Sequence, residues 1–270
     1  MRIDLLSNDE RAKSAKELLD RHHTVRSGAL FSPSDTPPDL LILPIPITRD
    51  GVTMNGTPYT LDDCRQALQR GAKKTAVLGY GACPEALLFT DYRDLSQDER
   101  FVSANAELTA EGGMMLLEKA FSSRGIALFS SVAVILGYGR IARAMAARLS
   151  AHGARVMIGA RRSEAREAAR RAGYIPFDPY DRAFFCERGR LLFAACAHAA
   201  VNTVPSPSVI PTLEGMPNAV CTLELSGKGD VLAATEALPF PALDGKAIPT
   251  RFFPKSAGEL LAEAILRQKI

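Results

Sequence analysis

Short apolar runs alternate with amphipathic stretches along the first hundred residues. The runs MRIDLLS, LLILPIPI and TAVLGYG are separated by NDERAKSAKELLDR and by TLDDCRQALQRGAKK. Short apolar runs bounded by turn residues are typical of buried strands, and a helical spacing of apolar positions is typical of amphipathic helices. Ser7 or Asn8 is expected to cap the first helix, and Gly71 to end the second. Strands that alternate with helices predict a parallel α/β unit.

A second α/β series follows a long helical stretch, NAELTAEGGMMLLEKAFSS, at residues 105–123. Its predicted strands are VAVILGYG, ARVMIGA, AAVNTVP and AVCTLELS, and its predicted helices are IARAMAARLSAHG, SEAREAARRAG and DRAFFCERGRLLFAACA. The last stretch, SAGELLAEAILRQKI, is an amphipathic helix. The predicted fold class is therefore α/β with two domains: residues 1–122 plus 255–270, and residues 123–254. We expect the long helix and the final helix to connect them.

Composition and charge narrow the classes of function. The chain has 270 residues and a net charge of only +3, and no basic run interleaved with aromatic residues indicates a nucleic-acid partner. Asp4 interrupts the apolar start, and the longest apolar runs are too short for a membrane span. Five cysteines are scattered without CxxC spacing, which favours reduced thiols and no metal site. We expect a cytoplasmic protein.

The tetrapeptide LGYG occurs twice, at Leu78–Gly81 and at Leu136–Gly139. A dinucleotide-binding loop needs a third small residue, three positions after the second glycine, and a helix that offers free N–H groups. The first copy has Pro84 at that position, and no clean strand is expected in TDYRDLSQDER after it. The second copy has Ala142, followed by a helix and a strand. The second copy is therefore the predicted cofactor loop, and the first an ordinary exit from a strand.

The end of the strand after this loop concerns the choice of cofactor. NAD enzymes usually have an acidic residue there, which binds the ribose 2′-hydroxyl. Here the sequence is GARRS, with Ala160, Arg161, Arg162 and Ser163. Two guanidinium groups and a helix-capping hydroxyl favour the 2′-phosphate of NADP. The second domain is thus predicted to be a Rossmann NADP-binding domain. The alternative is that both arginines are merely solvated and that Ser163 only caps its helix.

Five motifs then occur in a characteristic order: NAELTAEGGMM, VAVILGYGRIARAMAARL, GARRSEA, VNTVPSPSV and PKSAGELL. From LPIPITRDG to the last helix, the chain resembles the A subunit of dipicolinate synthase. This resemblance implies an NADP-linked oxidoreductase of the lysine and diaminopimelate pathway branch that serves sporulation. The implied substrate is dihydro- or hydroxytetrahydro-dipicolinate, and the implied product is pyridine-2,6-dicarboxylate. The family works with a second, flavoprotein-like chain, the B subunit of dipicolinate synthase.

The resemblance also assigns residues to roles. The implied cofactor loop consists of Gly137, Tyr138, Gly139, Arg140 and Ile141, and the implied 2′-phosphate group of Ala160, Arg161, Arg162 and Ser163. The residues implied near the nicotinamide ribose are Asn202, Thr203, Val204 and Pro205. The implied catalytic residues are Asn105, Thr109 and Glu111 at the start of the long helix, and Lys255 and Ser256 before the last helix.

Aromatisation of a dihydropyridine removes a hydride and a proton, so a proton acceptor and groups for two carboxylates are needed. We expect the N-terminus of the long helix, at residues 109–112, to bind one carboxylate. Lys255, Arg251 or Arg49 is expected to bind the other, and Glu111 is the candidate base. The alternative is that Thr109 and Glu111 only stabilise a helix end. His198, just before a strand, is expected to be a core histidine.

Two stretches depart from the family pattern. ELSGKGD at residues 224–230 lacks the proline of the family's Pro-Gly-Gly turn, and LDGK at residues 243–246 is followed by a longer IPTRFF. Two alternatives therefore stay open. One is another NADP enzyme of similar build that acts on a shikimate-like or hydroxy-acid substrate. The other is a non-catalytic nucleotide-binding component of a complex with a flavoprotein-like partner. The oligomeric state, including a homo-oligomer, is not fixed by the sequence.

Overall fold

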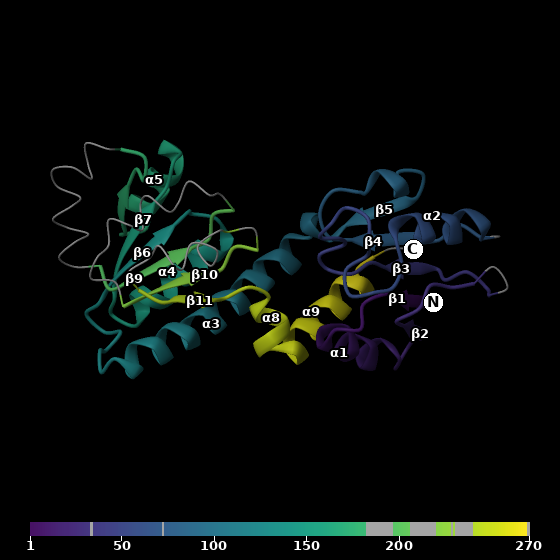
Figure 1. Cartoon of the computed structure of the whole chain (residues 1–270), viewed down its shortest axis with the longest axis horizontal. Helices are drawn as coiled ribbons and strands as arrows, with labels where there is room; N and C mark the ends of the chain where they lie inside the picture. Colours follow the sequence, from purple (N-terminus) through teal and green to yellow (C-terminus); the bar gives the residue numbers. More distant parts are fainter. Residues whose placement is uncertain are drawn as a thin grey trace. The chain divides into compact units, whose positions relative to one another are not determined.

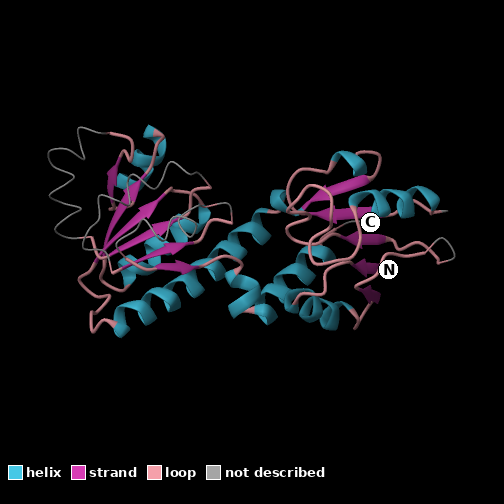
Figure 2. Ribbon diagram, in the orientation of Figure 1, coloured by secondary structure: helices cyan, strands magenta, loops and turns pink. Residues whose placement is uncertain are grey.

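The computed structural model describes residues 1–32, 35–71, 73–181, 197–205, 220–227, 229 and 240–268. By its internal contacts the chain divides into two compact units. Unit 1 consists of Met1–Asn105 and Pro249–Ile270, and unit 2 consists of Ala106–Ile248. Figure 2 shows that each unit contains one sheet with helices packed beside it.

Unit 1 is built on a five-stranded sheet in which every pairing is parallel (Figure 1). Its strands are β1 (Arg2–Leu5), β2 (Thr24–Ser27), β3 (Leu40–Ile42), β4 (Ala76–Gly79) and β5 (Asp91–Asp94), in the order β2-β1-β3-β4-β5. This is a doubly wound order. The predicted strands β1, β3 and β4 are confirmed. The sequence analysis missed β2 and β5, because TVRS and DYRD are polar strands at the sheet's edges.

The helices of unit 1 are α1 (Glu10–Leu19), α2 (Leu61–Arg70) and α9 (Pro254–Leu266), with two short 3₁₀ turns, η1 (Glu85–Leu87) and η2 (Leu95–Gln97). Asp9 caps α1 by accepting a 2.8 Å hydrogen bond from the Ala12 amide, so the expected caps Ser7 and Asn8 were wrong. The final helix was expected to connect the domains. It lies entirely within unit 1, and the chain returns to unit 1 at α8 (Ile248–Phe252).

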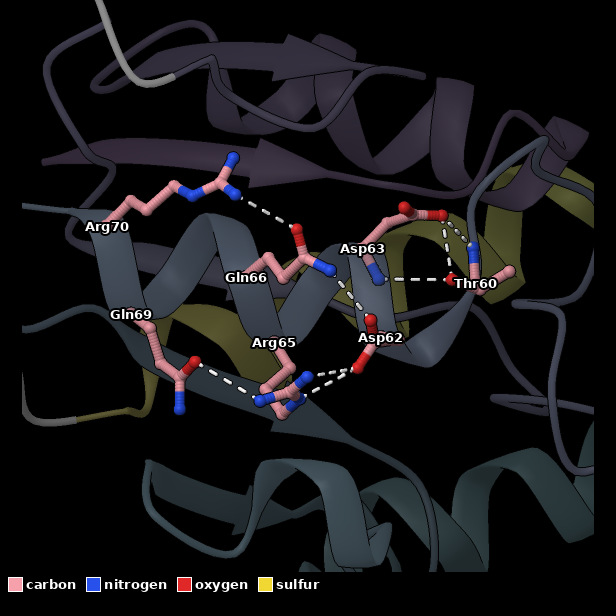
Figure 3. A network of polar contacts seen from close by, with 7 residues as sticks. All are labelled: Thr60, Asp62, Asp63, Arg65, Gln66, Gln69 and Arg70. Carbon is pink, nitrogen blue, oxygen red and sulfur yellow. Dashed lines mark hydrogen bonds and ion pairs between the residues drawn. The ribbon is translucent and has the colours of Figure 1, made fainter.

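Polar side chains brace α2 along its exposed side (Figure 3). Thr60 and Asp63 form a reciprocal capping box at its start. Asp62 accepts hydrogen bonds from Arg65 and Gln66, one turn further along. Such pairs, three or four residues apart, each stabilise a helix slightly. As expected, α2 ends at Gly71.

Unit 2 is built on a six-stranded sheet, again with parallel pairings throughout. The strands are β6 (Val132–Leu136), β7 (Arg155–Gly159), β8 (Ile175–Phe177), β9 (Ala199–Asn202), β10 (Cys221–Glu224) and β11 (Ala242–Asp244). Their order, β11-β10-β9-β6-β7-β8, is that of the Rossmann fold. Helices α4 (Arg140–Ala151) and α5 (Ser163–Arg171) connect β6, β7 and β8. The predicted α/β fold class is confirmed; most of the helix predicted at residues 181–197 lies outside the described residues.

The long helix α3 spans Glu99–Ser123 and contributes to both units. It begins six residues before the predicted start, because the Asp98 carboxylate accepts hydrogen bonds from the amides of Arg100 and Phe101. Gly113, in its second half, lies against side chains of Leu223 and Met145. This packing places the division between the units within α3, at Asn105, and not at the predicted residue 122. No helix in the described part of the chain is long and apolar enough to span a membrane.

Candidate functional site

A cavity of about 370 Å³ lies in unit 2 at the carboxyl ends of β6, β7 and β9. In this strand order the chain leaves β6 toward β7 on one side and returns as β9 on the other. Open α/β sheets bind their ligands at this switch point. The residues that line the cavity are Leu136, Gly137, Tyr138, Gly139, Gly159, Ala160, Arg161, Arg162, Ala165, Pro179, Tyr180, Val204 and Pro205.

Gly137 forms the floor of this cavity where β6 ends. Its φ of +96° is in the region that favours glycine. A Cβ at this position would lie 2.5 Å from the Thr203 hydroxyl oxygen and 3.0 Å from a methyl group of Val204. The Thr203 hydroxyl in turn donates a 2.6 Å hydrogen bond to the Leu136 carbonyl. Gly137 thus lets the chain after β6 pass close to the chain after β9.

Gly139 stands at the N-cap position of α4, and no side chain caps this helix. This start of a helix therefore suits an anion, which the helix dipole also favours. Ala142, the third small residue of the motif, is completely buried, as close packing of helix and strand requires. Arg140 and Ile141 form the first turn of α4 but do not line the cavity.

Tyr138 lies in the cavity wall, where its ring contacts one cationic and one aromatic side chain. The guanidinium carbon of Arg143 lies 5.0 Å from the centre of the Tyr138 ring. Tyr174 meets the same ring edge-on, with ring centres 6.3 Å apart. Burial, and then the nearby Tyr138, raise the pKa of Tyr174. These contacts hold the Tyr138 ring in place in the wall.

The GARRS stretch forms the side of the cavity beyond β7. Ala160 is buried, whereas Arg161 and Arg162 are exposed at the cavity. Among the described residues, neither guanidinium group has a hydrogen-bond or ion-pair partner. Ser163 is the first residue of α5 and not its cap; Arg162 takes the cap position and makes no side-chain cap bond. The predicted capping role of Ser163 was therefore wrong, and the first turn of α5 also leaves N–H groups for a ligand.

Sequence reasoning missed two residues that hold this side of the cavity. Nη1 of Arg166 donates hydrogen bonds to the carbonyl oxygens of Ala160 and Arg161, at 2.8 and 2.7 Å. It also pairs with the Asp178 carboxylate at 2.9 Å. Asp178 accepts a further bond from the amide of Tyr180, another lining residue. Only the helical spacing of Arg166 from Arg162 could have drawn attention to it.

Asn202 and Thr203 are placed behind the cavity wall and do not line it. Asn202 is completely buried, and its side-chain amide donates to both oxygens of the buried Glu224 carboxylate, at 3.1 and 3.0 Å. Its oxygen accepts a 3.0 Å bond from the amide of Val204. Asn202 thus links β9 to β10 through Glu224, and its contact with the nicotinamide ribose stays a prediction. Val204 and Pro205, also predicted, do line the cavity.

The backbone of Gly81, in the first LGYG copy, is hydrogen-bonded to side chains of the protein itself. A strand, β5, does follow it, contrary to expectation, and supplies Tyr92 and Asp94. The Asp94 carboxylate accepts a 2.7 Å bond from the Gly81 amide, and the Tyr92 hydroxyl donates to the Gly81 carbonyl at 2.9 Å. Because its own carboxylate takes the place of an anion, this loop is not a phosphate site.

The residues of α3 that were predicted for substrate chemistry do not share one face of the helix. Thr109 is buried in the middle of α3, ten residues after its start, so its N–H lies within the helix and is not free. The predicted anion site at residues 109–112 was therefore wrong. Glu111 is exposed, two residues and thus more than half a turn away from Thr109. Asn105, half-buried, shares the face of Thr109.

Lys255 and Ser256 lie in unit 1, in the first turn of α9, and Lys255 is exposed. The His198 ring accepts a 3.1 Å bond from the Val132 amide, as expected of a structural histidine. In the stretches that depart from the family pattern, Lys228 and Asp230 lie outside the described residues. No group of histidine, cysteine or acidic residues in the described part of the chain is arranged to hold a metal.

A larger hollow, of about 1100 Å³, lies in unit 1 at the amino ends of β3, β4 and β5. Its charged side chains include two ion pairs, Lys73 with Asp39 and Arg93 with Asp91. The amino ends of parallel strands are the less usual side for ligands. The cavity in unit 2 is therefore the better candidate.

Comparison with known proteins supports a nucleotide-binding fold in unit 2. Residues 131–215 match the family model described as NADP oxidoreductase coenzyme F420-dependent. The chain also resembles solved structures across almost its whole length. The A subunit of dipicolinate synthase from Bacillus halodurans is 19% identical, with a TM-score of 0.79 over 98% of this chain and 96% of that one. The A chain of dipicolinate synthase from Bacillus subtilis is 22% identical, with a TM-score of 0.75 over 98% and 94%.

D-lactate dehydrogenase from Salmonella is 13% identical, with a TM-score of 0.62 over 100% of this chain and 98% of that one. No curated protein matches the chain. At these identities the neighbours establish a shared two-domain, dehydrogenase-like fold. The donors in the cavity fit a phosphate-bearing dinucleotide: an uncapped helix start beside a glycine loop, and two arginines without partners among the described residues.

Proposed function

We propose that this protein is an NADP-dependent oxidoreductase of the dehydrogenase type. The observation that carries the proposal is the position of Arg161 and Arg162, which line the cavity beside the glycine loop where NAD enzymes have an acid. Two guanidinium groups suit a 2′-phosphate, since charge-assisted hydrogen bonds to phosphate are strong and geometrically specific. The match of residues 131–215 to an oxidoreductase model and the dehydrogenase-like fold support it.

The test compares two nucleotides that differ by one phosphate. NADPH and NADH are titrated calorimetrically into the wild type and into R161A/R162A. The wild type should prefer NADPH, and the variant should lose affinity for NADPH by about a hundredfold, as two charge-assisted bonds are removed, with little change for NADH. The matched control, R170A/R171A, removes the same charge from the other end of α5 and should leave both affinities unchanged. Equal losses for both nucleotides would contradict the proposal.

We further propose that the substrate is dihydro- or hydroxytetrahydro-dipicolinate and the product pyridine-2,6-dicarboxylate. Support comes from the five ordered motifs and from the similarity of fold to two structures of the dipicolinate synthase A chain. Bound NADP supplies the acceptor for the hydride that leaves the ring. The ring also loses one proton, and the hydroxytetrahydro form additionally loses water. The flavoprotein-like B subunit of dipicolinate synthase is the proposed partner, and a spore-forming bacterium's cytoplasm is the proposed location.

The chain's own residues then have to bind the dicarboxylate and accept the proton. Lys255 is an exposed cation in the first turn of α9, suited to a carboxylate, with Ser256 beside it. Asn105 and Thr109 share one face of α3, where Asn105 is the more accessible. Glu111, on another face of α3, stays the candidate base for the released proton, and solvent is the alternative acceptor.

This finer proposal is tested by absorbance at 340 nm with NADP and freshly generated dihydrodipicolinate, with and without the flavoprotein-like partner. NADPH formation is expected, and K255A should raise KM. Turnover with 2-hydroxy acids in place of dihydrodipicolinate would favour a hydroxy-acid dehydrogenase, a function that the similarity to D-lactate dehydrogenase also allows. NADPH binding with turnover of neither substrate would favour a non-catalytic role in a complex.

A further inference from the structure

Arg166 occupies the centre of a small hydrogen-bonded cluster beneath the GARRS stretch. One nitrogen, Nη1, lies within hydrogen-bonding distance of three acceptors, between which its two hydrogens are shared: the carbonyls of Ala160 and Arg161 and the carboxylate of Asp178. The amide of Ala160 is bound from the other direction by the Phe177 carbonyl at 3.1 Å. The turn that carries Arg161 is thus fixed to α5 on one side and to the end of β8 on the other.

Asp178 connects this turn to the lining residues that follow the neighbouring strand β8. One carboxylate oxygen pairs with Arg166, and the other accepts a 3.0 Å bond from the Tyr180 amide. Pro179 and Tyr180 line the cavity, as do Arg161 and Arg162. The Arg166–Asp178 pair therefore holds together the segments after β7 and β8, which line the side of the cavity expected to receive the adenosine end of a dinucleotide.

The charges in the cluster distinguish Arg166 from its neighbours. The carboxylate of Asp178 neutralises the Arg166 guanidinium, and both side chains are about one-quarter to one-third exposed. Arg161 and Arg162, in contrast, have no side-chain partner among the described residues. Arg166 thus adds little net charge to the site, and its three bonds point into the protein.

We propose that Arg166, paired with Asp178, is a positioning residue that determines specificity for the 2′-phosphate by fixing the Ala160–Arg161 backbone. This inference rests on the proposed use of NADP and deepens it. Without Arg166 two carbonyls lose their donor, and the turn is free to move Arg161 away from the phosphate. A group that merely stabilised the fold would affect nucleotides with and without the 2′-phosphate alike.

The experiment uses two small probes, adenosine 2′,5′-bisphosphate and 5′-AMP, titrated into the full chain at low and at high salt. We expect R166A to weaken binding of the bisphosphate about tenfold, the equivalent of one or two hydrogen bonds, and to change 5′-AMP binding less than about twofold. R170A is the matched control, because Arg170 lies one turn further along α5 and pairs with Glu167 on the surface. It should change neither affinity.

The double variant R166A/D178A separates positioning from charge, since it removes one charge of each sign. We expect it to weaken bisphosphate binding as much as R166A does, and the loss to persist at high salt, where electrostatic effects are screened. Recovery of wild-type affinity in the double variant would overturn the positioning role. So would equal losses for both probes, or an R166A affinity equal to that of R170A.

Two further measurements keep the outcomes distinct. If the wild type binds both probes equally, the proposed NADP preference itself fails, whatever R166A does. If R166A does not fold, as judged by its thermal unfolding, R166K decides. A lysine keeps the charge but lacks the planar fork, so bisphosphate affinity should fall and 5′-AMP affinity should stay the same.

Discussion

At Gly137 both the backbone conformation and the close packing around it oppose any residue other than glycine. Its positive φ excludes most side chains energetically, and the Thr203 hydroxyl excludes even a methyl group sterically. Gly173, in the same unit, has a similar φ of +86° but open space around it. The two glycines therefore separate the cost of conformation from the cost of a clash.

We predict that G137A abolishes measurable NADPH binding and lowers the free energy of unfolding by about 2–4 kcal/mol, because both costs apply. G173A should lower it by about 1 kcal/mol, the conformational cost alone, and should leave NADPH affinity unchanged. Urea unfolding and NADPH titration of the two variants provide the measurement. A G137A protein that binds NADPH like the wild type would show that the loop has another function.

At the residue scale the sequence predicted the part of the site that depends on local chemistry. Gly137, Gly139 and the two arginines line the cavity, and their predicted roles follow from backbone freedom and from charge. Asn202 was assigned to a ligand, but its partner Glu224 lies 22 positions away and only the sheet brings the two together. Arg166 was missed for a similar reason, since its role depends on Asp178 beyond the next strand.

At the scale of elements, the start of α3 and the end of α9 are joined through one carboxylate. Asp98 caps α3 and also accepts a 2.8 Å ion-pair contact from Arg267, the C-cap residue of α9. Burial by itself would raise the pKa of Asp98, but the hydrogen bonds from Arg267 and the Phe101 amide outweigh it. The pKa therefore lies below its usual range.

A pKa that is lowered in the folded state stabilises the protein above the unfolded-state pKa of about 4. This stabilisation is lost as the pH falls through the lower, folded-state pKa. We predict that D98N lowers the stability of the protein at neutral pH and makes its unfolding less sensitive to acid below about pH 4. R267Q, which removes the cation, should act in the same direction. Urea unfolding between about pH 2 and 7 measures this, and identical pH profiles for all three proteins would refute it.

Element types were predicted better than element boundaries. Strands such as β3 and β6 are almost wholly buried, so an apolar run identifies them. The start of α3 was misplaced because it depends on the Asp98 carboxylate, which lies outside the predicted helical stretch. The polar strand β5 is held by its pairing with β4, which no local pattern reveals.

On the scale of the whole molecule, unit 1 depends on a segment distant in sequence. Gly258 of α9 lies directly on α1, where a Cβ would come within 2.5 Å of the Ser14 Cβ and 2.8 Å of the Arg11 carbonyl. The core of unit 1 includes Leu261 and Ile265 from the same helix. The close approach of α1 and α9 therefore requires glycine at residue 258.

We predict that G258V separates these helices and destabilises unit 1 by about 2–4 kcal/mol, because overpacking falls partly on backbone atoms. Amide hydrogen exchange should increase in α1, β1 and α9 and stay unchanged in β6 and α4 of unit 2. G113A, in α3, is the control, since its Cβ would make only ordinary contacts of 3.4 Å or more. An equal increase in exchange in both units would show that they unfold together.

The division of the chain also dictates an order of assembly during translation. The strands of unit 1 leave the ribosome first, yet the apolar side of α1, with Ala12, Ala15 and Leu19, is covered only in part until α9 has been made. Residues 106–248 are synthesised in between, so most of unit 2 is made while unit 1 still lacks α9. During that interval the nascent chain exposes the part of the α1 surface that α9 later covers, and this is the surface that a chaperone would be expected to bind.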